Sequence, residues 1–346
     1  MASDIIRIGL IGYGSWARSA YVPSFRLDGR TNIFAVAAPS EVTRALATTE
    51  LGPNVRTFGS ASELLAAGSI DAVTIAVPDP AHEETMAAVM EAGLPLLFEP
   101  PVAADRDGVE RMLTTVRAYQ LPIHPNLELS YLPVIARVHD HVSAGAIGQP
   151  QHAHIRLQAG WRHPPGLALS VIHMLACWYL DVLDLVACGQ VQRVLVPHVG
   201  RSTDLLRPRA IAHLDYGNLL GTFDVNIAAV GSLSIDIEVN GSDGDIACDP
   251  LAGTWRLRTR DYPHWRMARD APLEPVAGWP GVHESIRAFL DSVEQGLPAT
   301  DARDAILRHH EVGLAVDRSY RTGAWETVGH TPPVRSNCQG SSPHVK

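Results

Sequence analysis

The stretch Ile8-Gly9-Leu10-Ile11-Gly12-Tyr13-Gly14-Ser15-Trp16-Ala17 decides the fold of this 346-residue chain. The apolar run over residues 5–11 predicts a buried strand, and a helix is expected directly after it. In the Gly-x-Gly-x-x-Ala turn between them, Gly12 permits a tight turn and Gly14 lets the backbone approach a pyrophosphate, while Ala17 allows close packing of the helix on the strand. The N-terminus of that helix would attract the anion. The stretch therefore predicts a dinucleotide-binding turn.

Strands and helices alternate in the segment that follows. Short apolar runs predict buried parallel strands, and each is joined to the next by a segment with helical composition. Such alternation favours right-handed crossovers and a doubly wound parallel sheet. The predicted strands are 33–38, 71–77, 94–98 and 121–124, and the predicted helices are 15–26, 41–51, 61–67, 83–92 and 105–119.

The pattern changes after about residue 125. Strand-like stretches follow one another and are separated by Gly and Asp turns, which predicts a largely antiparallel open sheet. We expect an α/β protein with a Rossmann domain over 1–125, an α+β domain over 126–330 whose last helices could pack back on the first domain, and a flexible tail over 331–346. The predicted strands are 151–158, 191–199, 210–216, 219–227, 232–240, 245–248 and 254–258, and the predicted helices are 131–144, 169–186, 282–295 and 301–322.

The bulk composition argues against several classes of protein. The net charge is -9 and no basic cluster offsets it, which argues against a nucleic-acid partner. No apolar run reaches the roughly 18 residues of a membrane span, and the N-terminus lacks the basic segment of a signal peptide. Cysteines at 177, 188, 248 and 338 form no paired spacing, which fits a reduced, cytoplasmic setting.

Three segments together make a family resemblance. They are Ile8-Gly9-Leu10-Ile11-Gly12-Tyr13-Gly14, then Asp71-Ala72-Val73-Thr74-Ile75-Ala76-Val77-Pro78 with His82, then Ala92-Gly93-Leu94-Pro95-Leu96-Leu97-Phe98-Glu99-Pro100-Pro101. They resemble the glucose–fructose oxidoreductase/inositol dehydrogenase family (Gfo/Idh/MocA). Residues 146–150, 301–305 and 318–323 resemble the turn into that family's second domain and its C-terminal helices, so the resemblance spans nearly the whole chain.

The resemblance implies NAD or NADP as cofactor and a small-molecule substrate. It also implies a homodimer or homotetramer formed through the C-terminal sheet. The cofactor contacts that it implies in the first domain lie at Gly12, Tyr13, Gly14, Trp16, Pro78, His82 and Glu99.

The adenosine end of the expected site departs from the usual pattern. Such folds place an acidic residue after the second strand to bind the ribose hydroxyls, and Ala38 stands there instead. Without that carboxylate NADP meets less repulsion, and Ser40, Thr43 and Arg44 could meet a 2′-phosphate. Arg44 could equally be a solvated helix residue. The sequence slightly favours NADP over NAD, and a chain that binds neither stays open.

The catalytic positions of the family are also changed. Pro100 replaces the Lys of the family's Glu-Lys-Pro motif and cannot carry a proton, although Glu99 could still reach the nicotinamide ribose. The family has an Asp four residues before a His on the long helix of the second domain. Here Leu169 replaces the Asp and His173 matches the His. His173 is the best candidate for a titrating group because its unperturbed pKa suits proton transfer near neutrality.

Other side chains could complete the site. Glu128 or Tyr131 could replace the lost acid, or could be a solvated carboxylate and a packing ring. Cys177, four residues after His173, could form a Cys–His pair or fill the core as a small hydrophobe. The loop Trp161-Arg162-His163 offers a ring, a guanidinium and a titrating group to a substrate, or is a surface loop with one anchored Trp.

The remaining histidines give weaker indications. His152 and His154 share one face of a strand, and with His163 they could bind a metal, but no third ligand has a convincing spacing, so we predict no metal site. His309 and His310 are adjacent on a helix and are expected on the surface.

Three functions remain open on the sequence. The first is an NAD(P)-dependent oxidoreductase with non-standard catalytic residues, acting on a small carbonyl, imine or sugar-derived substrate. The second is a non-redox cyclase, lyase or isomerase that reuses the fold. The third is a binding or regulatory protein without turnover.

Overall fold

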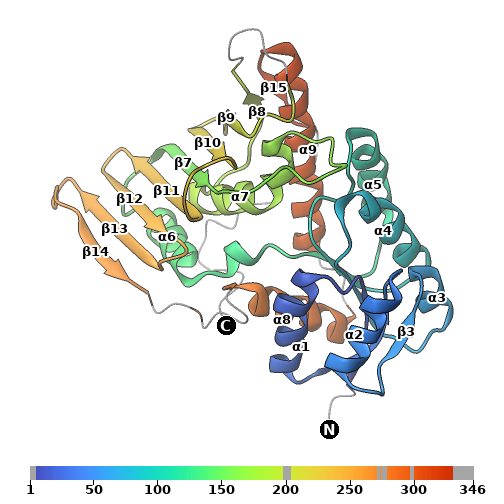
Figure 1. Cartoon of the computed structure of the whole chain (residues 1–346). Helices are drawn as coiled ribbons and strands as arrows, with labels where there is room; N and C mark the ends of the chain where they lie inside the picture. The colour runs from blue at the N-terminus through green and yellow to red at the C-terminus, as the bar shows by residue number, and fades with distance from the viewer. Residues whose placement is uncertain (1–4, 198–203, 271–272, 274–278, 297–299, 330–346) are drawn as a thin grey trace. The chain divides into compact units, whose positions relative to one another are not determined.

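The computed structural model describes residues 5–197, 204–270, 273, 279–296 and 300–329 (Figure 1). The chain forms two compact units: unit 1 contains residues 1–128 and 275–303, and unit 2 contains residues 129–274 and 304–346. The predicted tail over 331–346 and Cys338 lie outside the described residues.

Unit 1 is built on a six-stranded sheet with the order β3-β2-β1-β4-β5-β6, and all of its pairs are parallel. The predicted doubly wound Rossmann sheet is confirmed. Strand β3 is absent from the sequence prediction, because none of its three residues is fully buried and no apolar run marks it. The strands are β1 (Ile6–Ile11), β2 (Thr31–Ala37), β3 (Arg56–Phe58), β4 (Ala72–Ile75), β5 (Leu96–Phe98) and β6 (Ile123–Pro125).

The helices of unit 1 follow the prediction with one exception. The helix expected over 15–26 contains a π-helical turn, Ala17–Tyr21, before α1 (Val22–Asp28) begins. Pro23 has no backbone N–H to donate, and the wider turn lies directly before it. The other helices are α2 (Glu41–Leu51), α3 (Ala61–Ala66), α4 (His82–Glu91), α5 (Arg106–Ala118) and α8 (Val282–Gln295).

Helix α8 joins unit 1 from far along the chain. Its buried residues Ile286, Phe289 and Leu290 share one apolar core with Leu10 of β1 and Phe25 of α1. Figure 1 shows α1 and α8 side by side. The stabilisation comes mainly from removing these apolar side chains from water.

Unit 2 is built on a nine-stranded sheet with the order β14-β13-β12-β11-β7-β10-β9-β8-β15. Its pairs are antiparallel except for β10 and β7, so the largely antiparallel sheet is confirmed. The strands are β7 (Pro150–Gln158), β8 (Arg193–Leu195), β9 (Arg209–Asp215), β10 (Leu220–Asn226), β11 (Ser234–Gly241), β12 (Gly244–Asp249), β13 (Thr254–Thr259), β14 (Arg266–Arg269) and β15 (Glu326–Thr327).

Helices cover one face of this sheet. Helix α7 (Val171–Ala187) packs against β7, β9, β10 and β11, and α6 (Pro133–Ser143) packs against β12 and β13. Alternate residues of β9 and β10 are buried beneath them, while the other residues face outward. The remaining long helix is α9 (Thr300–Thr322).

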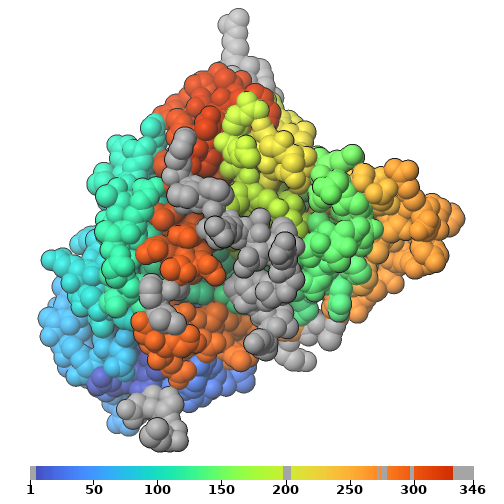
Figure 2. All heavy atoms as spheres, turned by 180° about the vertical axis from the view of Figure 1, so that it is seen from behind, coloured from blue at the N-terminus to red at the C-terminus, as the bar shows by residue number. Residues whose placement is uncertain are grey.

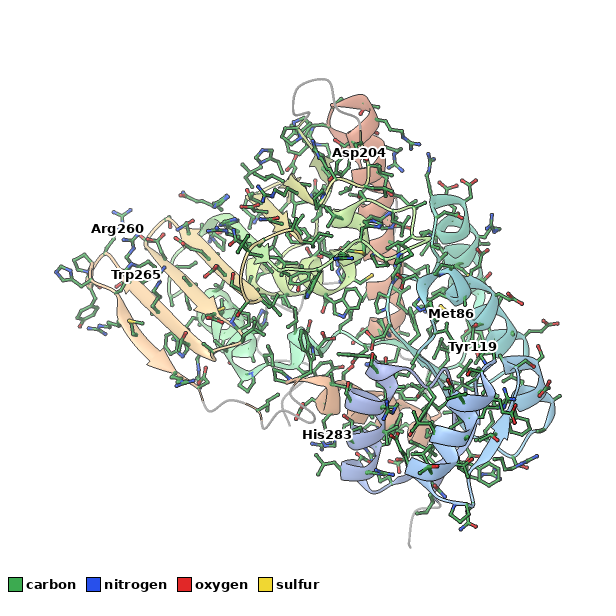
Figure 3. The ribbon with its side chains drawn as sticks, in the orientation of Figure 1. Met86, Tyr119, Asp204, Arg260, Trp265 and His283 are labelled. Atoms are coloured by element: carbon green, nitrogen blue, oxygen red, sulfur yellow. The ribbon has the colours of Figure 1, made fainter. Side chains whose placement is uncertain are left out.

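The two edge strands of unit 2 are absent from the sequence prediction. All four residues of β14 are exposed, so no alternation marks it, and β15 has only two residues. The edge hairpin of β13 and β14 projects as an orange lobe in Figure 2. At its tip Trp265 lies within cation–π distance of Arg256 and Arg258, and Figure 3 labels Trp265 beside Arg260.

Candidate functional site

The glycine turn of unit 1 has the geometry that a pyrophosphate needs. Gly12 has a φ of +91°, and a Cβ there would lie 2.2 Å from the carbonyl oxygen of Ala76. Gly14 has open space where a Cβ would stand. The turn follows β1, which pairs with β2 on one side and β4 on the other, and this is the point where strand order reverses. Ligands of doubly wound sheets bind at that point, so the cradle fits a dinucleotide.

Only the backbone of Tyr13 forms part of this turn, because its side chain points toward α2. The ring is buried and its hydroxyl donates to Oε2 of Glu50 on α2 at 2.9 Å. Burial and the Glu50 charge raise the pKa of Tyr13 to about 12. Tyr13 therefore holds α2 against the turn.

The adenosine end of the site carries an anchored guanidinium. Ala38 is buried, and Ser40 caps α2 by accepting from the backbone N–H of Thr43. Arg44 donates through Nη1 to the carbonyl oxygens of Ala38 at 2.7 Å and Pro39 at 2.8 Å. The half-buried Arg44 is thus fixed at the end of β2, where the sequence analysis left a freely solvated side chain open.

Glu99 is the centre of a polar cluster at the end of β5. Its Oε1 accepts from Nε1 of Trp16 at 2.5 Å, from the hydroxyl of Tyr21, and from Nδ2 of Asn126 at 2.9 Å. Burial raises the pKa of Glu99 to about 7, against the effect of the three hydrogen bonds. The cluster holds a carboxyl group that can change its charge near neutral pH.

His82 bridges the segments that follow β4 and β5 at the carboxyl edge of the sheet. Its Nδ1 lies 2.6 Å from the carbonyl oxygen of Pro101 and its Nε2 lies 2.9 Å from that of Val77. The ring is buried, and Pro78 begins the turn that leads to it. His82 therefore shapes the strand exits, because both of its nitrogens are already engaged.

Glu128 is buried, which contradicts the reading of a solvated loop carboxylate. Its Oε1 accepts from Nε1 of Trp279 at 2.9 Å. The Trp279 ring meets Trp16 edge-to-face at 5.9 Å between centroids, which places a second indole–carboxylate pair beside the Glu99 cluster. Tyr131 follows at the end of a 3₁₀ turn, Glu128–Tyr131, and it belongs to unit 2.

Unit 2 contains a buried carboxylate–imidazole pair. Nδ1 of His173 on α7 lies 2.6 Å from Oδ2 of Asp317 on α9. Oδ1 of Asp317 also accepts from the backbone N–H of Ser170 at 3.3 Å. Ser170 is the N-cap of α7, so Leu169 lies before the helix, whereas the sequence predicts a helix that begins at residue 169.

Gly313 gives the His173 ring its place against α9. A Cβ at Gly313 would lie 2.0 Å from Cδ2 and 2.5 Å from Nε2 of His173. Nε2 itself is buried and has no hydrogen-bond partner among the described residues. Asp317 and Gly313 are absent from the sequence prediction. The one sign of Asp317 in the sequence is an acid at the end of the otherwise apolar run Leu314-Ala315-Val316-Asp317.

Cys177 contacts His310 rather than His173. Its Sγ lies 3.4 Å from Nδ1 of His310, which also lies 2.8 Å from the carbonyl oxygen of Ile306. Burial raises the pKa of Cys177 and lowers that of His310 to about 3, so neither group is charged near neutral pH. Both shifts oppose the formation of a thiolate–imidazolium nucleophile here.

His309 and His310 are buried, so the prediction that they lie on the surface is wrong. The physical reason is that α9 is enclosed on most of its faces, because residues from Ala305 to Tyr320 are buried on every turn. Nε2 of His309 lies 3.7 Å from both Asp181 and Asp184 of α7.

The candidate substrate loop is tied to the start of α7. Nε2 of His163 lies 2.9 Å from the carbonyl oxygen of Leu169, one residue before the N-cap. Trp161 and Arg162 are exposed. The loop thus places an exposed ring and guanidinium in the segment that leads to His173.

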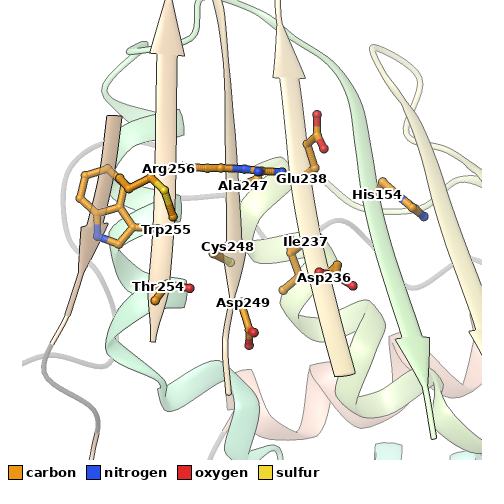
Figure 4. Close-up of a pocket in the computed structure, with 11 residues that line it drawn as sticks. His154, Asp236, Ile237, Glu238, Ala247, Cys248, Asp249, Thr254, Trp255 and Arg256 are labelled. Atoms are coloured by element: carbon orange, nitrogen blue, oxygen red, sulfur yellow. The ribbon is translucent and has the colours of Figure 1, made fainter. Parts of the chain in front are cut away.

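The outer face of the unit 2 sheet contains a shallow cavity of about 220 Å³ (Figure 4). Acidic side chains of β11 and β12, Arg256 and His154 line it. The rings of His152 and His154 lie 6.3 Å apart. No group of three or more His, Cys, Asp or Glu among the described residues could hold a metal ion. Within the same residues, no helix is long and apolar enough to cross a membrane.

Comparison with known proteins places the chain. Residues 6–127 match the model of GFO_IDH_MocA, an oxidoreductase family with an NAD-binding Rossmann fold. Residues 6–127 belong to this family's NAD-binding domain. The Gfo/Idh/MocA match covers the Rossmann unit that carries the glycine turn, and it confirms the resemblance seen in the sequence.

Relatives in the family differ in how much of the chain they match. Inositol 2-dehydrogenase of Corynebacterium glutamicum (strain R) is 32% identical over 133 residues, which is 38% of this chain and 37% of that protein. The rhizopine catabolism protein MocA of Rhizobium meliloti is 26% identical over 142 residues, or 41% and 44% of the two chains. The chain thus spans less than half the length of these two relatives. D-apiose dehydrogenase of Paraburkholderia graminis is 24% identical over 322 residues, or 85% and 82%.

Solved structures share the whole fold. Levoglucosan dehydrogenase in complex with NADH and levoglucosan has a TM-score of 0.80 at 17% identity, covering 94% of this chain and 100% of that one. GenD2 from gentamicin A biosynthesis in complex with NAD has a TM-score of 0.76 at 18% identity, covering 94% and 97%. At these identities the likeness extends to the two-unit fold and no further.

Proposed function

We propose that the protein is an NAD(P)-dependent oxidoreductase that acts on a small carbonyl, imine or sugar-derived substrate. The observation that carries the proposal is the glycine turn, where Gly12 is held in a conformation few other residues adopt and Gly14 leaves open space. The turn stands at the strand-order reversal of an NAD-binding family fold.

The residues of unit 1 would hold the cofactor in a definite order. The backbone at Gly12–Gly14 and the following helix N-terminus would bind the pyrophosphate, and Arg44 would meet the adenosine ribose or its 2′-phosphate. Trp16 and Glu99 would border the nicotinamide end. A bound nicotinamide would supply hydride transfer, and the protein must then provide positioning and a route for the proton.

His173 is the group to which we assign the proton. The family's Lys and Asp are replaced by Pro100 and Leu169, so neither of these positions can carry it. His173 has one nitrogen bonded to Asp317 and its other nitrogen, Nε2, without a partner in the described part of the chain. Such an arrangement suits a general base or acid.

Cofactor binding and turnover test the proposal directly. Fluorescence titration of the purified protein with NADH and NADPH should give saturable binding well below ~1 mM, since KM values usually lie between about 1 µM and 1 mM. Turnover should be tried with NAD⁺ or NADP⁺ and inositol, D-apiose or levoglucosan, the substrates named for similar proteins. His173→Ala should lower kcat/KM by about 10²–10⁴-fold, the usual contribution of a general acid or base. Absence of binding by both dinucleotides would refute the proposal.

A second candidate is a non-redox cyclase, lyase or isomerase that uses the same site. The replacement of both the Lys and the Asp by Pro100 and Leu169 favours it, since these are the positions that serve redox proton transfer in the family. Dinucleotide binding without any absorbance change at 340 nm during substrate conversion would favour this candidate over the first.

We also propose a homodimer or homotetramer formed through the outer face of the unit 2 sheet. Ile211 and Leu220 are exposed apolar side chains on adjacent strands of that sheet. Light scattering of the wild type and of an Ile211→Asp, Leu220→Asp variant tests this arrangement. A measured molar mass equal to that of a single chain for the wild type would contradict it.

A further inference from the structure

We infer that Asp317 is the positioning residue of His173, supplying from α9 the carboxylate that Leu169 cannot provide. The inference rests on the proposed function, in which His173 transfers the substrate proton. Asp317 is a buried acid that lies 144 residues from His173 in the sequence, and the inference gives it a role in orienting the imidazole.

The Asp317 carboxylate is held in place by two donors at the start of α7. Oδ2 lies 2.6 Å from Nδ1 of His173, and Oδ1 accepts from the backbone N–H of Ser170. Ser170 in turn accepts through Oγ from the backbone N–H of His173 at 3.2 Å. The N-terminus of a helix of 17 residues adds a favourable field for the negative charge. The carboxylate, the cap and the imidazole therefore form one connected unit.

This contact determines which ring nitrogen carries the proton. An ionised carboxylate only accepts hydrogen bonds, so Nδ1 must donate, and in the neutral ring Nε2 then carries the lone pair. Nε2 is buried, and no described residue bonds to it. A neutral histidine in water favours the other tautomer, with the proton on Nε2. Asp317 would therefore hold His173 in the tautomer whose Nε2 can accept a proton.

The proton and electrons balance with this assignment. If a substrate alcohol were oxidised, its O–H bond would break and Nε2 of His173 would take the proton, while oxidised NAD or NADP would supply the acceptor for the hydride. The oxygen's electron pair forms the new C=O bond. The imidazolium that results is stabilised by Asp317, and the reverse sequence serves carbonyl reduction.

The other groups around the ring support this task. His310 of α9 meets the His173 ring edge-to-face at 6.0 Å between centroids, and burial keeps it neutral, with a pKa of about 3. Gly313 leaves room for the ring. Asp317 is thus the charged side chain that the described residues place in hydrogen-bond contact with His173.

Asp317→Asn tests the inference, with Asp184→Asn as its matched control. Asp184 is a buried carboxylate in the same helix pair: it accepts from the Tyr216 hydroxyl at 2.8 Å and lies 3.2 Å from Nε of Arg308. Both changes remove a buried charge between α7 and α9, but only one touches His173. The readout is the ¹⁵N spectrum of the histidine side chains in the full chain, with the His173 signals assigned by His173→Gln.

The expected wild-type result is a neutral His173 protonated at Nδ1. Asp317→Asn should shift it toward protonation at Nε2 and lower kcat at least about 100-fold with little change in KM, as removal of an orienting carboxylate does elsewhere. Asp184→Asn should keep the wild-type tautomer, and Asp317→Glu should restore part of kcat.

Three results would overturn the inference. The first is a wild-type ring protonated at Nε2, a result that does not depend on the folding of Asp317→Asn. The second is an unchanged tautomer in Asp317→Asn. The third is a changed tautomer with an unchanged pH profile of kcat. Failure of the wild type to bind NADH or NADPH would instead refute the proposed function, and the tautomer would still decide whether Asp317 orients His173.

Discussion

Oδ2 of Asp317 lies 2.6 Å from Nδ1 of His173, and the two buried side chains come from helices α9 and α7 of the same unit. By the family resemblance, Leu169 stands where an acid is expected four residues before this histidine, and another acid contacts the ring from a different helix. The site could therefore keep a carboxylate–imidazole pair although neither usual proton-transfer partner remains.

Gly313→Ala should disturb this pair without removing either member. The new Cβ would lie 2.0 Å from Cδ2 of His173, so the ring must move away from Asp317. We expect a loss of about 1–3 kcal/mol in the free energy of unfolding, typical of overpacking, and a fall in kcat. Urea denaturation and steady-state kinetics measure both. Gly329→Ala is the control, since its Cβ would meet Glu311 at an ordinary 3.4 Å; equal effects in the two variants would contradict the prediction.

Cys177 should resist thiol reagents in the folded protein. Burial raises the pKa of Cys177 and of Cys248, so little thiolate is present at pH 8, and both are buried away from the reagent. Native iodoacetamide treatment followed by mass spectrometry should leave both unmodified, while the half-buried Cys188 reacts. Rapid alkylation of Cys177 would restore the possibility of a nucleophilic thiol.

Local pattern was enough to predict much of the fold. The bounds of α2 and α8 agree with the sequence prediction because caps and glycines mark their ends. Strands β3 and β14 were missed because neither presents an apolar run. The π-helical turn before Pro23 was missed because the sequence motif sets the start of a helix but not its internal hydrogen bonds.

The candidate site was less predictable than the fold. His173 was found from its place in a family pattern, whereas Asp317 stands 144 residues away and meets it only through the packing of α9 on α7. His309 and His310 were misplaced because adjacent residues on an exposed helix would point apart into water, and α9 is instead enclosed. Short-range spacing carries no information about which helix packs against which.

Glu99 should make the stability of the protein fall as the pH rises. Its pKa is raised from 4.5 to about 7 in the folded state, so the folded protein holds the proton more tightly than the unfolded chain. The resulting stabilisation is complete below about pH 4.5 and is lost as the pH rises through about 7; it amounts to at most about 3 kcal/mol. The buried His310, whose pKa is lowered to about 3, contributes a slope of opposite sign below about pH 6.5. The slope due to Glu99 is therefore the difference between the wild type and Glu99→Gln in urea denaturation between pH 5 and 8.

Glu99→Gln should flatten that slope, because the amide does not titrate. Glu50→Gln is the control: hydrogen bonds from Arg18 and Tyr13 lower the pKa of Glu50, so its removal cannot flatten a slope of this sign. A pH dependence of stability that is the same in Glu99→Gln and in the wild type would contradict the prediction.

Arg44→Ala should weaken NADPH more than NADH. The guanidinium is fixed at the end of β2 by two carbonyl oxygens, and both contacts use Nη1. A hydrogen bond to a charged group contributes about 1.5–3 kcal/mol, so the NADPH Kd should rise about 10–100-fold while the NADH Kd changes little. Fluorescence titration measures both. An equal loss for the two dinucleotides would mean that Arg44 acts through the structure of the β2 exit rather than on a 2′-phosphate.

Gly12→Ala and Gly14→Ala should separate folding from cofactor binding. At Gly12 the φ of +91° and the 2.2 Å approach to the Ala76 carbonyl oxygen both oppose a side chain, so alanine should destabilise unit 1 by about 2–4 kcal/mol.

At Gly14 nothing lies within 4 Å of the added methyl, so the protein should fold with nearly unchanged stability. The methyl would instead occupy the space where the pyrophosphate is expected, and the Kd for NADH or NADPH should rise at least about tenfold, since a loss of 1.4 kcal/mol suffices. Thermal unfolding and dinucleotide titration of both variants measure the two effects. A Gly14→Ala protein that binds the dinucleotide as tightly as the wild type would show that the turn holds no phosphate, because its open space is the feature on which the cofactor assignment depends.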